Sequence, residues 1–298
     1  MVMYFDVFHH PLTEAELTRL VAPGRPEAIL AACDHLVGRG LVAREGRWRF
    51  RPGMSADIAR RRMRARHAEV MWPWAVRAAE VLDRLPWVSG LMVTGSLSKK
   101  STGPGGDVDF LVLVQPGRVW TLKTALQAMR RVLPPPAREL FCTNYLLATD
   151  RLQIEDRNLY TAVELATAVP LAGRDACVAL LEANGWARRF VPGLDWSLER
   201  AKNLPHRAVL EPAPAGGAGE GLERAALHAW DRYWDRKYGW LDEGVRRQRF
   251  KRSDGVATNH LHDFRDYVLR EVGARLDAAG LHESLDYDEV DDESCGLP

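Results

Sequence analysis

The sequence holds only four cysteines among its 298 residues, and no two of them form a C-x-x-C pair. This scarcity disfavours a disulfide framework and a zinc knuckle, and it makes a reducing cytoplasm the expected location. No apolar run approaches the roughly 18 residues of a membrane span, and the N-terminus lacks the basic and apolar regions of a signal peptide. We therefore expect no membrane partner.

Net charge is nearly absent as well, because 41 basic residues face 40 acidic ones. The charge is nevertheless unevenly distributed. Residues 47–66, RWRFRPGMSADIARRRMRAR, contain eight arginines and a single acid, Asp57, whereas residues 283–293, ESLDYDEVDDE, are strongly acidic. The arginine block indicates either a phosphate-binding face or a solvated helix face, and the acidic block indicates a solvated tail.

The first 54 residues have the order helix, helix, helix, hairpin. Thr13 and Glu16 fit a capping box that begins a helix to about Val21, and Pro26 fits the first turn of the next helix. Residues 41–50, LVAREGRWRF, predict a hairpin. This order resembles a winged helix, a fold that often binds DNA through its third helix. That helix offers few outward side chains for reading bases, which favours packing or protein contact over DNA binding.

The middle of the chain predicts an α/β (α+β) fold with a mixed sheet. A long helix is expected over residues 55–85, strands over 91–94 and 108–114, a helix over 119–132, a strand pair over 139–148 and 151–154, and a helix over 160–171. Beyond residue 186 the apolar spacing is helical. The expected parts are a winged-helix-like domain (1–54), a core with its leading helix (55–185), a helical C-terminal part (186–282) and an acidic tail (283–298).

Two acids stand where a buried strand would carry apolar residues, in LMVTGSLSKKSTGPGGDVDFLVLV at residues 91–114. Alternate side chains of a strand share a face, so we expect Asp107 and Asp109 to point the same way and Val108 to point into the core. Two carboxylates on one face can hold Mg²⁺, which prefers oxygen ligands. Gly95 allows close backbone approach to phosphates, and Ser96 can donate hydrogen bonds to them. A surface turn capped by two acids is the alternative.

Gly95-Ser96, ten intervening residues and Asp107-Val108-Asp109 resemble the signature of the DNA polymerase β-like nucleotidyltransferase superfamily. The resemblance implies transfer of an NMP group from an NTP, with ATP among the candidates, to a hydroxyl or phosphate of an unidentified acceptor. It implies Mg²⁺, or Mn²⁺, at Asp107 and Asp109, and triphosphate contacts at Gly95 and Ser96. Positive charge near the phosphates could come from Lys99, Lys100 or Lys123, although each also fits an ordinary surface lysine.

Members of this superfamily usually carry a third carboxylate on a later strand, and this chain departs from that pattern. The corresponding strand, ELFCTNYLLA, has Asn144 near the expected third-acid position. Asp150, Glu155 or Asp156 would substitute if the strand register differed. The departure leaves open a one-metal enzyme or an inactive nucleotide binder.

Other features point to rival functions. The winged helix and the arginine block together would suit a regulator that senses a nucleotide and binds DNA or a protein. The arginines of residues 60–66 would alternatively suit a transferase that acts on RNA. Glu164 could reach the mouth of the site, although a solvent-facing position on its helix is favoured. His260 and His262 have the look of a metal pair, but a helix N-terminus with ordinary polar contacts is favoured there.

Overall fold

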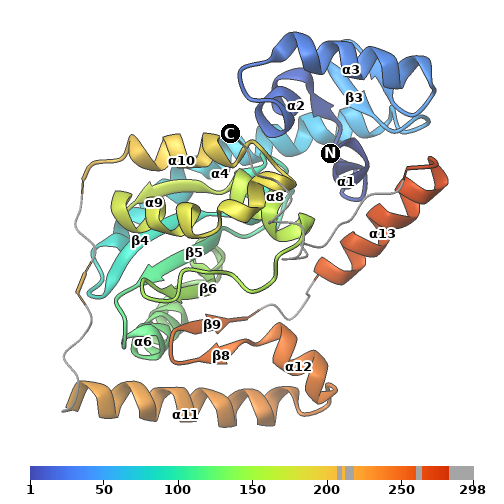
Figure 1. Ribbon diagram of the computed structural model, residues 1–298. Helices are drawn as coiled ribbons and strands as arrows, with labels where there is room; N and C mark the ends of the chain where they lie inside the picture. The colour runs from blue at the N-terminus through green and yellow to red at the C-terminus, as the bar shows by residue number, and fades with distance from the viewer. Residues whose placement is uncertain (207–209, 212–217, 260–263, 282–298) are drawn as a thin grey trace.

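Figure 1 shows the computed structural model of the chain, in which a small N-terminal domain sits at one end of a larger domain built around a six-stranded sheet. The structure describes residues 1–206, 210–211, 218–259 and 264–281. The predicted acidic tail and the His260/His262 pair lie outside these residues. The fold is mixed α/β, as predicted. Within the described ranges, no helix combines the length and the apolarity that crossing a membrane requires.

The N-terminal domain has the predicted order of helices and hairpin, with one additional short strand. Its elements are α1 (Val2–Asp6), β1 (Leu12–Thr13), α2 (Glu14–Val21), α3 (Pro26–Gly38), β2 (Ala43–Glu45) and β3 (Trp48–Phe50). β3 lies between β1 and β2 in a three-stranded sheet. The capping box is confirmed, because the Thr13 amide donates to Glu16 Oε2 at 2.8 Å and the Glu16 amide donates to Thr13 Oγ1 at 3.2 Å.

The main sheet has the strand order β7-β4-β5-β6-β9-β8, and only β5 and β6 run parallel. Its strands are β4 (Val88–Val93), β5 (Asp109–Val114), β6 (Cys142–Ala148), β7 (Val169–Ala172), β8 (Arg252–Ser253) and β9 (Val256–Thr258). Leu111 and Leu113 of β5 face one apolar cluster, whereas Phe110, Val112 and Val114 face another. Both faces of β5 are therefore buried, which accounts for its uninterrupted apolar run.

Helices cover both faces of this sheet (Figure 1). One cluster holds side chains of α8, α9 and α10, and the other holds side chains of α4, α6 and α11. The other helices of the larger domain are short or lie at its periphery. All its helical elements are α4 (Asp57–Asp83), α5 (Gly95–Ser98), α6 (Val119–Val132), α7 (Pro135–Glu139), α8 (Leu159–Thr167), α9 (Arg174–Ala183), a 3₁₀ turn (Gly185–Arg189), α10 (Leu194–Lys202), α11 (Ala218–Tyr238), α12 (Glu243–Arg249) and α13 (Arg265–Ala278).

Three predictions about these elements were wrong. The expected helix over 160–171 ends at Thr167, and residues 169–172 form β7 at the edge of the sheet. Pro170 is tolerated there because one side of an edge strand has no neighbouring strand that needs its N–H. Residues 151–154 form no strand; the Ile154 amide donates to Asn184 Oδ1 at 2.9 Å, and β9 pairs with β6 instead. The C-terminal part is consequently not helical throughout, since it adds β8 and β9 to the core sheet.

Helix α11 is attached to the core by a buried carboxylate at the start of α6. Glu223 accepts hydrogen bonds from the Trp120 amide at 2.7 Å, the Thr121 amide at 2.8 Å and Thr121 Oγ1 at 2.6 Å. These amides belong to the first turn of α6, which has no intrahelical acceptors for them. A carboxylate also interacts favourably with the helix dipole there, so Glu223 caps α6 from a distant segment.

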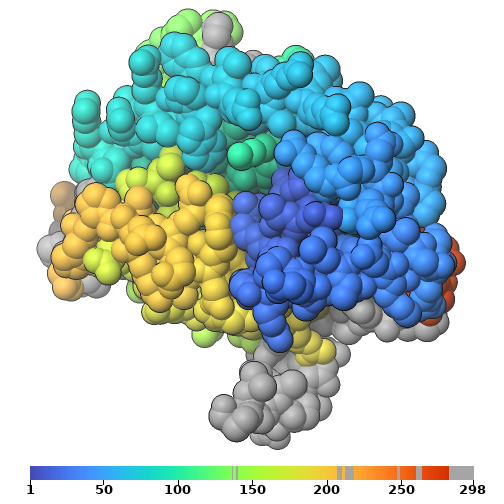
Figure 2. All heavy atoms as spheres, turned by 90° about the horizontal axis from the view of Figure 1, so that it is seen from above, coloured from blue at the N-terminus to red at the C-terminus, as the bar shows by residue number. Residues whose placement is uncertain are grey.

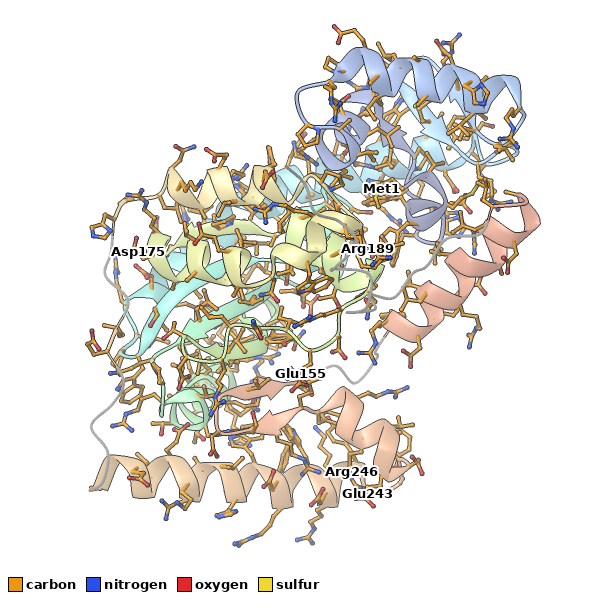
Figure 3. The ribbon with its side chains drawn as sticks, viewed as in Figure 1. Met1, Glu155, Asp175, Arg189, Glu243 and Arg246 are labelled. Carbon is orange, nitrogen blue, oxygen red and sulfur yellow. The ribbon has the colours of Figure 1, made fainter. Side chains whose placement is uncertain are left out.

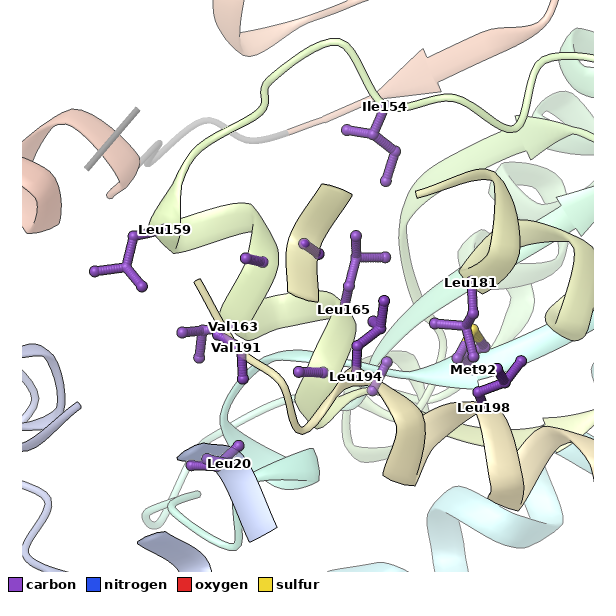
Figure 4. Close-up of a cluster of buried hydrophobic side chains, with 14 of the residues drawn as sticks. Leu20, Met92, Ile154, Leu159, Val163, Leu165, Leu181, Val191, Leu194 and Leu198 are labelled. Carbon is purple, nitrogen blue, oxygen red and sulfur yellow. The ribbon is translucent and has the colours of Figure 1, made fainter. Parts of the chain in front are cut away.

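Apolar packing joins the N-terminal domain to the larger one. Leu20 of α2 belongs to the cluster that contains Val191 and Leu194, and Figure 4 shows the three side chains close together. The Gly193 amide donates to the Leu20 carbonyl at 3.0 Å. In the space-filling view the blue N-terminal domain lies directly against the gold α10 and the light-blue to cyan α4 (Figure 2).

A buried arginine adds a polar link between the two domains. Arg61 of α4 is only 3% exposed and donates to Glu16 Oε1 at 2.8 Å and to the His10 ring at 3.0 Å. Its third contact is the Lys100 carbonyl, at 2.9 Å. Lys100 belongs to the loop between Ser96 and Asp107, so Arg61 joins His10 and Glu16 of the N-terminal domain to the backbone of that loop.

Candidate functional site

The candidate site forms where three strand ends meet at one edge of the sheet. β4 runs antiparallel to β5, so its C-terminal end lies beside the start of β5, with Val93 opposite Phe110. The Thr94 amide donates to the Asp109 carbonyl at 3.0 Å. β6 runs parallel to β5 and pairs Cys142 with Asp109. Residues distant in sequence are thereby brought to one edge.

Gly95 occupies a position that no other residue could fill without rearrangement. Its φ of +65° lies in the left-handed region, and a Cβ built there would stand 2.3 Å from Asp109 Oδ2. The sequence pattern suggested only that glycine lets the backbone approach a phosphate. The structure adds that glycine is needed for the Asp109 carboxylate to pack against the backbone.

Asp107, Asp109 and Cys142 form a cluster in which one ligand atom of each lies within 4.8 Å of the others. Val108, between the two aspartates, is fully buried, as the alternation predicted. Asn144 Nδ2 donates to Asp109 Oδ1 at 2.9 Å, and Cys142 Sγ lies 3.3 Å from Asn144 Oδ1. Asn144 is thus in contact with Asp109, but it presents an amide N–H there and not a carboxylate.

The cluster concentrates negative charge. Burial, followed by the neighbouring charges of Asp107 and Glu164, raises the pKa of Asp109 from 3.8 to about 7, while Asn144 and Lys99 act in the opposite direction. Burial and the same two aspartates raise the pKa of the Cys142 thiol to about 12. A cation placed among these groups would relieve the repulsion between the carboxylates.

Glu164 of α8 lies inside the site, and not at the solvent-facing position that the sequence favoured. The Gly95 amide donates to its Oε2 at 3.2 Å, and Lys99 Nζ lies 2.8 Å from both of its oxygens. Lys99 also donates to the Gly95 carbonyl at 3.0 Å. One signal in the sequence could have indicated this position: Glu164 stands between Val163 and Leu165, both buried in the core.

The remaining predicted phosphate ligands lie in different surroundings. Ser96 is exposed at the start of α5, with its Oγ 2.6 Å from Thr102 Oγ1. Lys123 is buried under α11, where its Nζ lies 5.4 Å and 5.1 Å from the ring centroids of Trp230 and Trp234. Burial lowers the pKa of Lys123 to about 8. The Lys123 ammonium group therefore contacts aromatic rings instead of the loop around Gly95.

The substitutes considered for the third acid lie elsewhere. Asp150 follows the C-terminal end of β6, whereas the cluster lies at its N-terminal end. Glu155 and Asp156 pair with Lys251, at 3.2 Å and 2.8 Å. Figure 3 shows Glu155 beside β9. None of these three acids joins Asp107 and Asp109.

Comparison of the chain with protein-family models, with curated proteins and with solved structures finds no match. The resemblance to nucleotidyltransferases therefore stays an expectation that rests on the sequence pattern of residues 95–109 alone.

Proposed function

We propose that this protein is a cytoplasmic, Mg²⁺-dependent nucleotidyltransferase, which transfers an NMP group from an NTP to a hydroxyl or phosphate of an acceptor. The observation that carries the proposal is the packing of the Gly95 backbone against the Asp109 carboxylate. This packing joins an anion-binding backbone to a pair of cation-binding carboxylates. A metal–triphosphate complex needs both kinds of group side by side.

The donor atoms of the cluster fit a hard divalent cation. Asp107 and Asp109 would hold Mg²⁺, or Mn²⁺, through carboxylate oxygens. The Cys142 thiol stays protonated at neutral pH because its pKa is raised to about 12, and a protonated thiol is a poor ligand. When bound, the cation would neutralise charge that develops on the transferred phosphoryl group.

Glu164 would be replaced by the triphosphate. In the structure its carboxylate is the anion that accepts hydrogen bonds from the Gly95 amide and from Lys99. Phosphate oxygens are acceptors of the same kind, and a triphosphate carries more negative charge than one carboxylate. Lys99 and the Gly95 amide would then hold the phosphates, and Ser96 at the exposed start of α5 would donate a further hydrogen bond.

In the transfer, the acceptor oxygen forms a bond to the α-phosphorus while the bond from that phosphorus to the β-phosphate oxygen breaks. Pyrophosphate leaves with the electron pair, held by Lys99 and the Gly95 backbone. The proton of an acceptor hydroxyl passes to water, because among the described residues no third carboxylate lies within 4.8 Å of both Asp107 and Asp109.

One observation favours a second candidate, a nucleotide-binding regulator without turnover. Asn144 contacts Asp109 through its amide N–H, where a third carboxylate would add a metal ligand and a base. An amide cannot act as a base, and its N–H cannot bind a cation. The fold would then bind the nucleotide and report it to the N-terminal domain through the Arg61 contacts with Lys100 and Glu16.

The test is thermal unfolding with each of the four NTPs, with and without Mg²⁺, for the wild type and for Asp107→Asn. A ligand at about 100 times its Kd stabilises the folded state by about 2.7 kcal/mol, which shifts the unfolding midpoint measurably. We expect one NTP to produce a Mg²⁺-dependent shift in the wild type and none in Asp107→Asn. Asp150→Asn, an exposed acid at the opposite end of β6, is the matched control and should respond like the wild type.

Pyrophosphate release then separates the two candidates. Release that depends on Mg²⁺ and on an added acceptor supports the transferase. A Mg²⁺-dependent shift without release, over a panel of hydroxyl and phosphate acceptors, supports the regulator. Absence of a shift with every NTP would refute both.

A further inference from the structure

The N-terminal turns of α4 carry a local excess of positive charge. Residues 58–68, IARRRMRARHA, contain five arginines and no acid. Three of these arginines are engaged: Arg60 lies 3.6 Å from Asp57, Arg61 holds the inter-domain contacts, and Arg64 donates to the Phe8 carbonyl at 2.9 Å. The two others, Arg62 and Arg66, have no such role.

Arg62 and Arg66 are exposed, one helical turn apart, and form no ion pair with any residue in the described ranges. Their surroundings are already positive. Burial and the neighbouring arginines lower the pKa of Arg64, and burial, Arg61 and Lys99 lower the pKa of His10. Arg62 and Arg66 add positive charge that no ion pair among the described residues balances, and such charge attracts an anion.

The two arginines line a groove of about 480 Å³ on the surface of α4. Met63 and Val70, which are 53% and 68% exposed, form its apolar part on α4. The opposite wall includes Pro104, which belongs to the loop between Ser96 and Asp107. A ligand in the groove would therefore lie next to the loop that ends at Asp107.

The same face of α4 continues toward its C-terminal end. Trp74 is 51% exposed, and the Arg77 guanidinium lies 5.3 Å from the centroid of its ring. Arg62, Arg66, Val70, Trp74 and Arg77 follow one another at intervals of three or four residues, which places them on one side of the helix. At 1.5 Å per residue the stripe is about 22 Å long, enough for several nucleotides of an extended strand.

We propose that this stripe, together with Pro104, binds a single-stranded polynucleotide; that the strand would also be the acceptor rests on the proposed function. Arginines bind the phosphate backbone, while exposed aromatic and apolar side chains stack on unpaired bases. A duplex hides its base faces and would leave Trp74, Val70 and Met63 without a partner. The stripe along α4 therefore favours a single strand over a duplex.

Fluorescence anisotropy with labelled oligonucleotides of about 12 nucleotides tests the proposal on the full-length protein chain. Single-stranded RNA, single-stranded DNA and a duplex are compared over about 50–200 mM NaCl, for the wild type and for R62A/R66A. R232A/R236A is the matched control, because these two exposed arginines have the same spacing on α11, at the opposite end of the molecule.

We expect R62A/R66A to bind single strands about tenfold or more weakly and to lose about 1.4 from the slope of log K against log salt, since each phosphate contact contributes about 0.7. R232A/R236A should bind like the wild type. Trp74→Ala should weaken binding of oligonucleotides about fivefold or more but leave binding of inorganic polyphosphate unchanged, because polyphosphate has no bases to stack.

Three results would overturn the proposal: wild type that binds no oligonucleotide, equal losses in the two double variants, or a polyglutamate peptide that competes as well as a single strand. The last result would make the stripe a site for an acidic protein.

NTP binding separates this proposal from the proposed function. If strands bind through Arg62 and Arg66 but no NTP shifts the unfolding midpoint, the proposed transferase function is refuted and the strand site is not. If an NTP shifts the midpoint but no strand binds through Arg62 and Arg66, the strand site is refuted and the transferase function is not.

Discussion

Replacement of Asp109 by asparagine should stabilise the metal-free protein. Asparagine has the shape of a protonated aspartic acid, and its side-chain oxygen can still accept the hydrogen bond from Asn144 Nδ2. The substitution removes a charge that is unfavourable in the folded state, because burial, Asp107 and Glu164 raise the pKa of Asp109. In the unfolded chain the same carboxyl ionises freely.

The magnitude follows from the two pKa values. A carboxyl with a pKa of about 7 in the folded protein and 3.8 in the unfolded chain binds more protons when folded, so stability falls as the pH rises between these values. The full difference corresponds to about 4 kcal/mol at about 1.4 kcal/mol per pKa unit, as an upper limit. Asp109 is partly exposed, and solvent screening reduces the expected gain at pH 8 to about 1–3 kcal/mol.

Thermal or urea unfolding in EDTA, at pH values between 4 and 8, measures this difference. The two proteins should be about equally stable near pH 4, and the advantage of Asp109→Asn should grow with pH and level off above about 7. Addition of Mg²⁺ should stabilise the wild type and reverse the order. A variant that is less stable than the wild type at pH 8, or a difference that does not change with pH, would refute the reasoning.

Four further predictions concern the site and its support. Gly95→Ala should lower the free energy of unfolding by about 1–3 kcal/mol and abolish the shift of the unfolding midpoint by Mg²⁺–NTP. Gly24→Ala is the control, because Gly24 has a similar φ but nothing within 4 Å of a Cβ built there; it should lower the free energy of unfolding by about 1 kcal/mol and leave the midpoint shift intact. Asn144→Asp should tighten Mg²⁺ binding in calorimetric titration, because it adds a carboxylate to the cluster; weaker binding would mean that the amide is required. Glu164→Gln should lower the Kd for Mg²⁺–NTP severalfold, since a neutral amide competes less well with phosphate for Lys99; a raised Kd would show that the carboxylate helps to hold the nucleotide. Glu223→Gln should cost about 1–3 kcal/mol in urea unfolding, since it weakens the cap of α6 without removing a site residue, and an unchanged midpoint would contradict that role.

The sequence by itself was sufficient to predict those elements that depend on interactions between residues close together in the chain. The capping box at Thr13 and Glu16, the proline at the start of α3 and the whole of α6 follow from residues at most four apart, and each was predicted. The spacing between Gly95 and Asp109 likewise sufficed to single out these two residues. Hydrogen bonds within a turn and the alternation along a strand operate over the same short distances that a sequence pattern records.

Only the tertiary structure decided which distant segments complete the site and the sheet. Glu164 reaches the Gly95 amide across 69 positions of the chain, and α8 gives way to β7 because an edge of β4 is open to it. β9 takes the edge of β6 that residues 151–154 were expected to fill. Such pairings depend on which strand edges and carboxylates remain unpartnered after the chain has folded, and that competition leaves no periodic trace in the sequence.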